Sequence, residues 1–248
     1  MQTLLERGAD VNAQCGEYGN ALQAAAYRGN EQIVQTLLER GADVNAQGGE
    51  CGNALQAAAC EGHEQIVQTL LERGADVNAQ GGHFGNTLQA AASGGNGQIV
   101  QTLLERGADV NAQGGQYGNA LQAAAYGGHE QIVQTLLERG ADVNAQGGHF
   151  GNALQVAASG GNEQIVQTLL ERGADVNAQG GRFGNALQVA AYRGHEQIVQ
   201  TLLERGADVN AQGGEYGNAL QAARKGNKDG IVRILEQWGA VDSTALSV

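Results

Sequence analysis

A Gly-Asn dipeptide recurs every 33 residues along this chain, and this period constrains the fold more than any other feature. Six full units follow one another at 17–49, 50–82, 83–115, 116–148, 149–181 and 182–214. Residues 1–16 match the second half of a unit, 215–241 form a divergent seventh unit, and 242–248 are left as a tail. A fixed period of this length indicates an array of similar units, each stacked on its neighbours.

Each unit is predicted to contain two short helices. In the first, Asn20 is followed three residues later by Gln23, which is the pattern of an N-terminal capping box. Three alanines come next, favour helix, and let a neighbouring helix approach closely. The second helix carries one apolar stripe at helical spacing, formed by Ile33, Val34, Leu37 and Leu38. Such a unit has few large apolar side chains, so it must stack on others to be stable.

Glycines are predicted to end both helices and to shape the loop between units. Gly29 follows the first helix and Gly41 the second, where a left-handed residue commonly closes a helix. Residues 42–52 are then expected to form an extended segment that turns at Gly48 and Gly49, where positive φ costs least.

The unit and its closing phrase LLERGADVNAQ resemble the ankyrin repeat, over essentially all of residues 1–241. Where ankyrin repeats usually carry Thr-Pro-Leu-His, this chain has Asn-Ala-Leu-Gln, as at 20–23, 53–56 and 119–122. Asn can cap a helix as Thr does, and Gln can return the hydrogen bond as His does. The resemblance implies an all-α fold, an ankyrin-repeat solenoid of stacked helix-turn-helix units with projecting β-turns.

A narrower resemblance concerns the phrase YGNALQAAA and the linker AQGG. Both are similar to ankyrin arrays at the C-termini of fungal NOD-like (NACHT-type) receptors, which implies the ligand-sensing array of a larger receptor. Repeats this alike would also arise in a consensus-type scaffold, and the two origins stay open here.

Charge and composition exclude several functions. The net charge of −12, with Lys225 and Lys228 as the only lysines, disfavours nucleic acid as a partner. No apolar run is long enough for a membrane span, and the N-terminus lacks the pattern of a secretory signal. Cys15, Cys51 and Cys60 are irregularly placed, which favours free thiols in a reducing compartment. We therefore expect a cytoplasmic protein.

The histidines do not predict a metal site. His63, His129 and His195 begin second helices and lie two repeats apart, which is roughly 20 Å at about 10 Å per helix layer. Capping or hydrogen bonding is expected for them instead. His83 and His149 fall on turns, with surface recognition or no role as the alternatives. No Gly-rich stretch matches a P-loop, and the acids recur in regular columns, so neither a cofactor nor an enzymatic activity is expected.

Three columns of residues change from unit to unit, while nearly all other positions stay constant. The column before the turn aromatic reads Glu17, Glu50, His83, Gln116, His149, Arg182, Glu215. The column at the end of the first helix reads Tyr27, Cys60, Ser93, Tyr126, Ser159, Tyr192, Lys225. The column beside it reads Arg28, Glu61, Gly94, Gly127, Gly160, Arg193, Gly226. The resemblance places turn tips and first-helix ends on the concave face, where ankyrin partners bind.

Tyr and Arg are enriched at interface hot spots, so these columns predict a binding surface, with neutral drift as the alternative. The residues predicted to contact a partner are Glu17, Tyr27, Arg28, Glu50, Glu61, His83, Gln116, Tyr126, His149, Arg182, Tyr192, Arg193, Glu215 and Lys225. A fourth column holds the turn aromatics Tyr18, Phe84, Tyr117, Phe150, Phe183 and Tyr216, with Cys51 as the exception. For these, packing inside the turn is favoured over ligand contact.

Two hypotheses for function follow. The first is a non-catalytic scaffold that binds a protein or peptide on its concave face. The second is a structural spacer or a stack that self-associates end to end, because Met1 aligns with the interior of a second helix and leaves an apolar flank uncovered. The seventh unit carries Arg224, Lys228, Arg233 and Glu236 where other units are less charged, which predicts a C-terminal cap over 215–241.

Overall fold

The computed structural model describes residues 7–14 and 16–242, and within these ranges all regular secondary structure is helical. The first helices of the repeats are α2 (Ala21–Tyr27), α4 (Ala54–Glu61), α6 (Thr87–Ser93), α8 (Ala120–Gly127), α10 (Ala153–Gly160), α12 (Ala186–Arg193) and α14 (Ala219–Lys225). The second helices are α3 (Glu31–Glu39), α5 (Glu64–Glu72), α7 (Gly97–Glu105), α9 (Glu130–Glu138), α11 (Glu163–Glu171), α13 (Glu196–Glu204) and α15 (Asp229–Gln237). The predicted all-α architecture of repeated helix pairs is confirmed.

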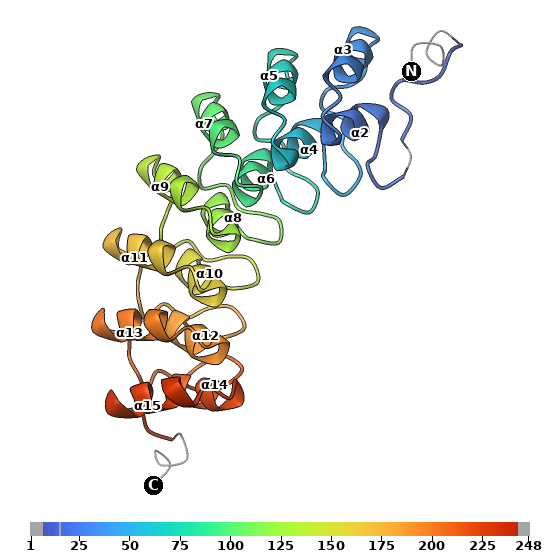
Figure 1. Ribbon diagram of the computed structural model, residues 1–248. Helices are drawn as coiled ribbons and strands as arrows, with labels where there is room; N and C mark the ends of the chain where they lie inside the picture. The colour runs from blue at the N-terminus through green and yellow to red at the C-terminus, as the bar shows by residue number, and fades with distance from the viewer. Residues whose placement is uncertain (1–6, 15, 243–248) are drawn as a thin grey trace. The chain divides into compact units, whose positions relative to one another are not determined.

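The helices belong to two compact units, Met1–Gly140 and Ala141–Val248. In the N-terminal unit, α2, α4, α6 and α8 pack side by side in one row, and each packs on its own second helix in a parallel row (Figure 1). In the C-terminal unit, α10, α12 and α14 form the corresponding row, backed by α11, α13 and α15. Within each unit the loops project from the side of the first-helix row (Figure 1).

The core of each unit lies between its two rows of helices. The alanines of the first helices are almost all fully buried, as Ala57, Ala58 and Ala59 show. Their small side chains let consecutive first helices lie in direct contact, as predicted. From the second helices, Val67 and Leu70 are buried. The apolar stripe predicted from spacing therefore faces the first-helix row.

The predicted capping box is present at the first helix. Asn20 Oδ1 accepts a hydrogen bond from the Gln23 backbone N–H at 2.9 Å, and the Asn20 N–H donates to Gln23 Oε1 at 2.8 Å. Gln23 also makes contacts that local spacing did not predict, because its Nε2 donates to Gly48 O and Gly52 O in the next loop, each at 3.1 Å. The Gln23 side chain thus completes the capping box of its own helix and is also hydrogen-bonded to the neighbouring repeat.

The expectation for residues 42–52 is wrong in part. The segment is not extended throughout, because the Ala46 N–H donates to Asp43 O at 3.2 Å and the Asn45 N–H donates to Asp43 Oδ1 at 2.9 Å. Asp side chains commonly accept a hydrogen bond from the backbone two residues on, and this folds the chain into a tight turn. The chain turns a second time after Gly48, whose N–H donates to Gly52 O at 2.8 Å and closes a projecting turn. This second turn is the predicted one.

The histidines that begin second helices do not cap them, so that part of the prediction is wrong. His63, His129 and His195 make no side-chain cap hydrogen bond. Instead, the Nε2 of each lies 3.0–3.2 Å from the carbonyl oxygen of residue 27, 93 or 159 in the preceding repeat. A carbonyl only accepts, so Nε2 must carry the proton and donate. The predicted alternative, hydrogen bonding, is confirmed as a link between repeats.

The divergent C-terminal repeat also folds as a helix pair. Ile231 and Leu235 of α15 are buried, whereas Arg224 is exposed and forms ion pairs with Glu236 at 3.4 Å and Asp242 at 2.5 Å. Its assignment as a cap stays a prediction. Residues 1–6 of the partial N-terminal repeat, Cys15, and residues 243–248 of the tail lie outside the described residues.

Candidate partner-binding face

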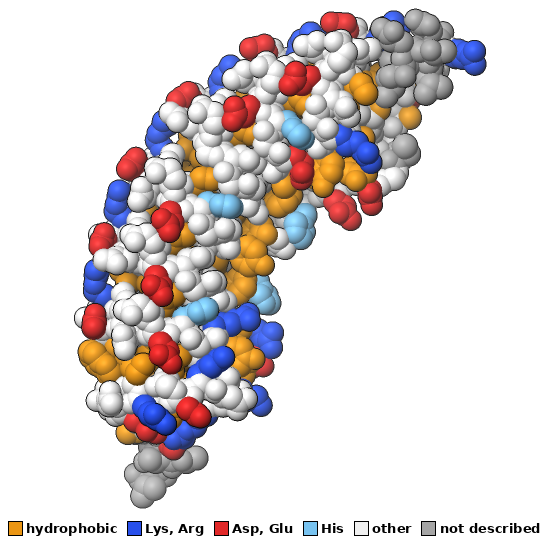
Figure 2. All heavy atoms as spheres, in the orientation of Figure 1, with side chains coloured by type: hydrophobic (Ala, Val, Ile, Leu, Met, Phe, Trp, Pro, Cys, Tyr) orange, Lys and Arg blue, Asp and Glu red, His pale blue; other side chains and the backbone are white. Residues whose placement is uncertain are grey.

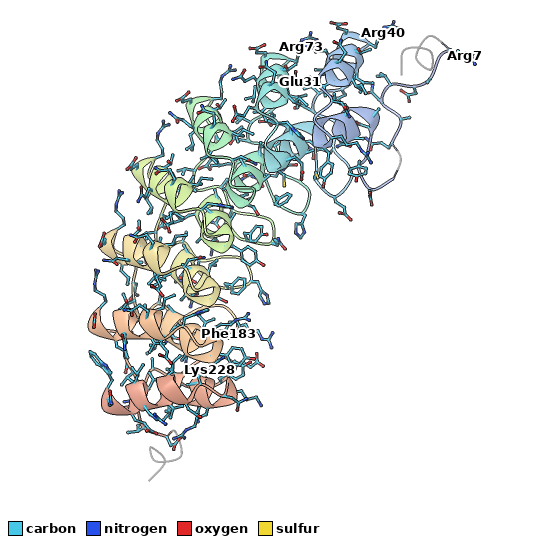
Figure 3. All side chains as sticks on the ribbon, in the orientation of Figure 1. Arg7, Glu31, Arg40, Arg73, Phe183 and Lys228 are labelled. Atoms are coloured by element: carbon cyan, nitrogen blue, oxygen red, sulfur yellow. The ribbon has the colours of Figure 1, made fainter. Side chains whose placement is uncertain are left out.

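The residues at the turn tips and at the ends of the first helices form one face of each unit, here termed the loop face. In the N-terminal unit it holds Glu17, Tyr27, Arg28, Glu50, Glu61, His83, Gln116 and Tyr126 from the predicted set. In the C-terminal unit it holds His149, Arg182, Tyr192, Arg193, Glu215 and Lys225. Arg40 and Arg73, at the C-terminal ends of the second helices α3 and α5, point away from the loops, whereas Phe183 lies on the loop side (Figure 3).

The turn tips are joined by backbone hydrogen bonds from repeat to repeat. The N–H of Glu50 donates to Glu17 O at 2.9 Å, that of His83 to Glu50 O at 2.8 Å, and that of Gln116 to His83 O at 3.2 Å. In the C-terminal unit, the Glu215 N–H donates to Arg182 O at 3.0 Å. All of these side chains are exposed. The variable turn residues of each unit therefore stand in an ordered row that is held by the main chain.

The turn aromatics pack on the helix-end column. The ring centroids of Tyr18 and Tyr27 lie 5.0 Å apart, and those of Tyr117 and Tyr126 lie 5.1 Å apart. Tyr126 remains 53% exposed beside this packing. Packing is confirmed for Tyr18 and Tyr117, but their partners lie at the end of the first helix and not inside the turn as predicted. These partners are themselves predicted binding residues.

In the C-terminal unit the aromatic residues and arginines form one cluster. The rings of Tyr192 and Tyr216 stack at 4.7 Å, and Phe183 lies 5.8 Å from Tyr192. The guanidinium groups of Arg182 and Arg193 lie over the Phe183 ring at 5.8 and 5.9 Å, a cation–π arrangement. Figure 2 shows Lys and Arg side chains beside hydrophobic ones on the loop side of α12 and α14.

An exposed ion pair completes this cluster. Arg182 Nε bonds to Glu215 Oε2, and this hydrogen bond lowers the pKa of the Glu215 carboxyl and raises that of Arg182. Both side chains are well exposed, so the pair contributes little to stability. Its effect is to fix the position of two charges at the turn tips.

The second repeat of the N-terminal unit departs from this aromatic pattern. Cys51 occupies the turn-aromatic position and Cys60 the helix-end position, and both thiols are free and half-buried. Burial, followed by the charge of Glu61, raises the pKa of Cys60 to about 12, and burial also raises the pKa of Cys51. These thiols therefore stay protonated at neutral pH and are poor nucleophiles.

Sequence reasoning missed the turn aromatics as part of the face. A signal was available: residues 18 and 27, 117 and 126, and 183 and 192 are each nine apart, across the capped start of a short helix. Among the described residues, no cluster of three or more His, Cys, Asp or Glu side chains could hold a metal ion. No described helix is both long enough and apolar enough to cross a membrane.

Stacked repeats with a constant frame, and with a chemically variable and mostly exposed face in each unit, are typical of a repeat-protein interaction scaffold. The chain belongs to the ankyrin-repeat family, because the family model "Ankyrin repeats (3 copies)" matches residues 1–81, 83–147 and 147–213. Ankyrin repeats are protein–protein interaction modules, and the fold is typically non-catalytic.

Among solved structures, the human ASB11 ankyrin repeat domain is similar to this chain. Its TM-score is 0.77 at 27% sequence identity, and the match covers 90% of this chain and 100% of that one. A comparison with curated proteins found no match.

Proposed function

We propose that the chain binds a protein or peptide partner through the loop face. Tyr27, Tyr126 and Tyr192 act as anchors, and the turn-tip side chains select the partner. The observation that carries this proposal is the alignment of the variable residues. Within each unit the chemistry changes along turns that are joined by backbone hydrogen bonds, while the frame behind them stays constant. Tyrosine and arginine are among the residue types that contribute most at interfaces.

A receptor role is a finer form of the same proposal. The resemblance of YGNALQAAA and AQGG to fungal NOD-like receptor arrays supports a ligand-sensing array within a larger protein. In that case the partner bound at the loop face would be the sensed ligand.

Replacing Tyr27, Tyr126 and Tyr192 together with Ala is expected to weaken partner binding at least about tenfold, since truncating one interface hot spot commonly costs more than 1 kcal/mol. The measurement is affinity capture from an extract of the source organism, with the wild-type and variant chains as baits, followed by titration of each retained protein. Circular dichroism checks that the variant keeps its helices.

The matched control replaces Gln32, Gln131 and Gln197 with Ala. These side chains are exposed on the second helices of the same three repeats. Proteins held by the wild type and by this control, but lost by the tyrosine variant, are partners of the loop face. If every specifically captured protein bound the tyrosine variant with wild-type affinity, the face would be assigned wrongly.

A further inference from the structure

A hollow of about 660 Å³ opens in the loop face of the N-terminal unit, at the second repeat. Cys51 and Cys60 line it, at the two positions where the first repeat packs Tyr18 on Tyr27. Thiols are much smaller than phenol rings, so this repeat leaves unfilled the space that the first repeat fills with its own side chains. The hollow has the volume of an ordinary ligand pocket.

Aromatic rings from the two adjacent repeats line the same hollow. Tyr27 comes from the preceding repeat and Phe84 from the following one. The ring of His83 contacts that of Phe84 edge-on, with 5.5 Å between the ring centroids. The hollow therefore combines aromatic surface with the apolar surface of two protonated thiols.

The charged side chains that line the hollow are acidic. Glu50 and Glu61 line it, and no Lys or Arg does. The negative charge of Glu61 is also the main cause of a raised pKa at Tyr27. Figure 2 shows acidic side chains beside hydrophobic ones on the loop side of α2 and α4. An anionic group would be repelled here, and a cation would be attracted.

The loop face already places cations over aromatic rings elsewhere. The Arg28 guanidinium lies 5.7 Å from the centre of the Tyr18 ring, and Arg193 lies 5.9 Å from that of Phe183. The second repeat carries Glu61 at the position of Arg28 and Arg193, so it offers rings and carboxylates without a cation of its own.

We propose that this hollow receives the side chain of a lysine or arginine from the partner polypeptide. The aliphatic stem contacts Cys51 and Cys60, and the charged end lies among Tyr27, Phe84 and the carboxylates of Glu50 and Glu61. This assignment rests on the proposed function and adds to it the chemistry of one anchor residue. Such a hollow would make the N-terminal unit selective for partner segments that carry a lysine or arginine.

The test uses small probes and the whole isotope-labelled chain. N-acetyl-arginine methylamide and N-acetyl-lysine methylamide are titrated by NMR, beside N-acetyl-citrulline methylamide, which has nearly the shape of the arginine probe without its charge. At least one basic probe should give saturable shifts at the amides of Glu50, Cys51, Cys60, Glu61 and His83. The citrulline probe should bind at least about tenfold more weakly, since desolvated cation–π and carboxylate contacts together reach this size.

Two variants complete the test. Cys51→Tyr with Cys60→Tyr recreates the pair of Tyr18 and Tyr27, so it should fold, fill the hollow and abolish the saturable shifts. The double variant Glu50→Gln with Glu61→Gln keeps the shape of the hollow. It should weaken binding of the basic probe to the level seen for the citrulline probe. The proposal is overturned if no probe binds, if citrulline binds equally well, or if the filled variant still binds. None of these results depends on the partner capture described above, so the two proposals can fail separately.

Discussion

Replacing Gln89 with Met is expected to lower the free energy of unfolding by about 3 kcal/mol, because a buried backbone N–H and a partly buried carbonyl lose their hydrogen-bond partners at once. Gln89 is fully buried, its Oε1 accepts from the Asn86 N–H at 2.9 Å, and its Nε2 donates to Gly114 O and Gly118 O at 3.0 Å. Met has a similar length but cannot make these bonds. The Asn86 N–H and the Gly114 carbonyl oxygen would each lose the hydrogen bond that Gln89 makes. The Gly118 carbonyl oxygen would still accept from the Gly114 N–H.

The matched control for this variant is Gln98→Met, at an exposed position on α7 of the same repeat. Its effect should stay within about 0.5 kcal/mol, as is usual for surface substitutions. Urea unfolding followed by circular dichroism measures both. Equal stability of the two variants would show that the glutamine column does not join the repeats.

Replacing Gly115 with Ala is expected to cost about 3 kcal/mol or more, because it adds steric overlap to backbone strain. Gly115 has a φ of +59°, and a Cβ there would lie 2.1 Å from the carbonyl oxygen of Phe84 in the preceding turn. Neither backbone segment can move freely, since Gln116 and His83 are hydrogen-bonded across the same junction.

Gly107→Ala separates the two causes of that cost. Gly107 has a φ of +87°, but a Cβ added there would have no neighbouring atom within 4 Å. Its replacement should cost only about 1–2 kcal/mol for the left-handed backbone. If Gly115→Ala were no more destabilising than Gly107→Ala in the same urea experiment, the turn tips would not be packed as tightly as described.

Features that depend on neighbours in sequence were predictable. The capping box of Asn20 and Gln23 and the left-handed Gly41 follow from local spacing, and the structure confirms both. The period of 33 residues also predicted the stacking, because one helix pair cannot bury its apolar surface alone.

Features that depend on the neighbouring repeat were not predictable from local spacing. His63 stands where a helix cap would, but its backbone is not in the extended conformation of Asn20, and its ring reaches a carbonyl 36 residues earlier in the chain. Gln23 likewise bonds to a loop 25–29 residues later. Such contacts require the stacking distance between repeats, which the period does not supply.

The positions of the variable columns could be predicted from the sequence, but the shape of the surface they form could not. The variable columns identified the loop face, and its members are mostly exposed, as a binding surface requires. The hollow at Cys51 and Cys60 was not foreseen, since a small residue at an aromatic position creates space only if the adjacent rings stay in place. In the sequence, Cys60 belongs to a variable column and Cys51 is the exception among the turn aromatics, but neither position by itself predicts a hollow.

Site-specific photo-cross-linking tests most directly whether the loop face is the binding surface. Benzoylphenylalanine is placed at Tyr126, which is 53% exposed on the loop face, or at Gln131, which is exposed on the second helix of the same repeat. On irradiation with a captured partner, the chain labelled at 126 should form a covalent complex, and the chain labelled at 131 should not. Cross-linking from 131 alone would contradict the assignment, because the partner would then occupy the side formed by the second helices.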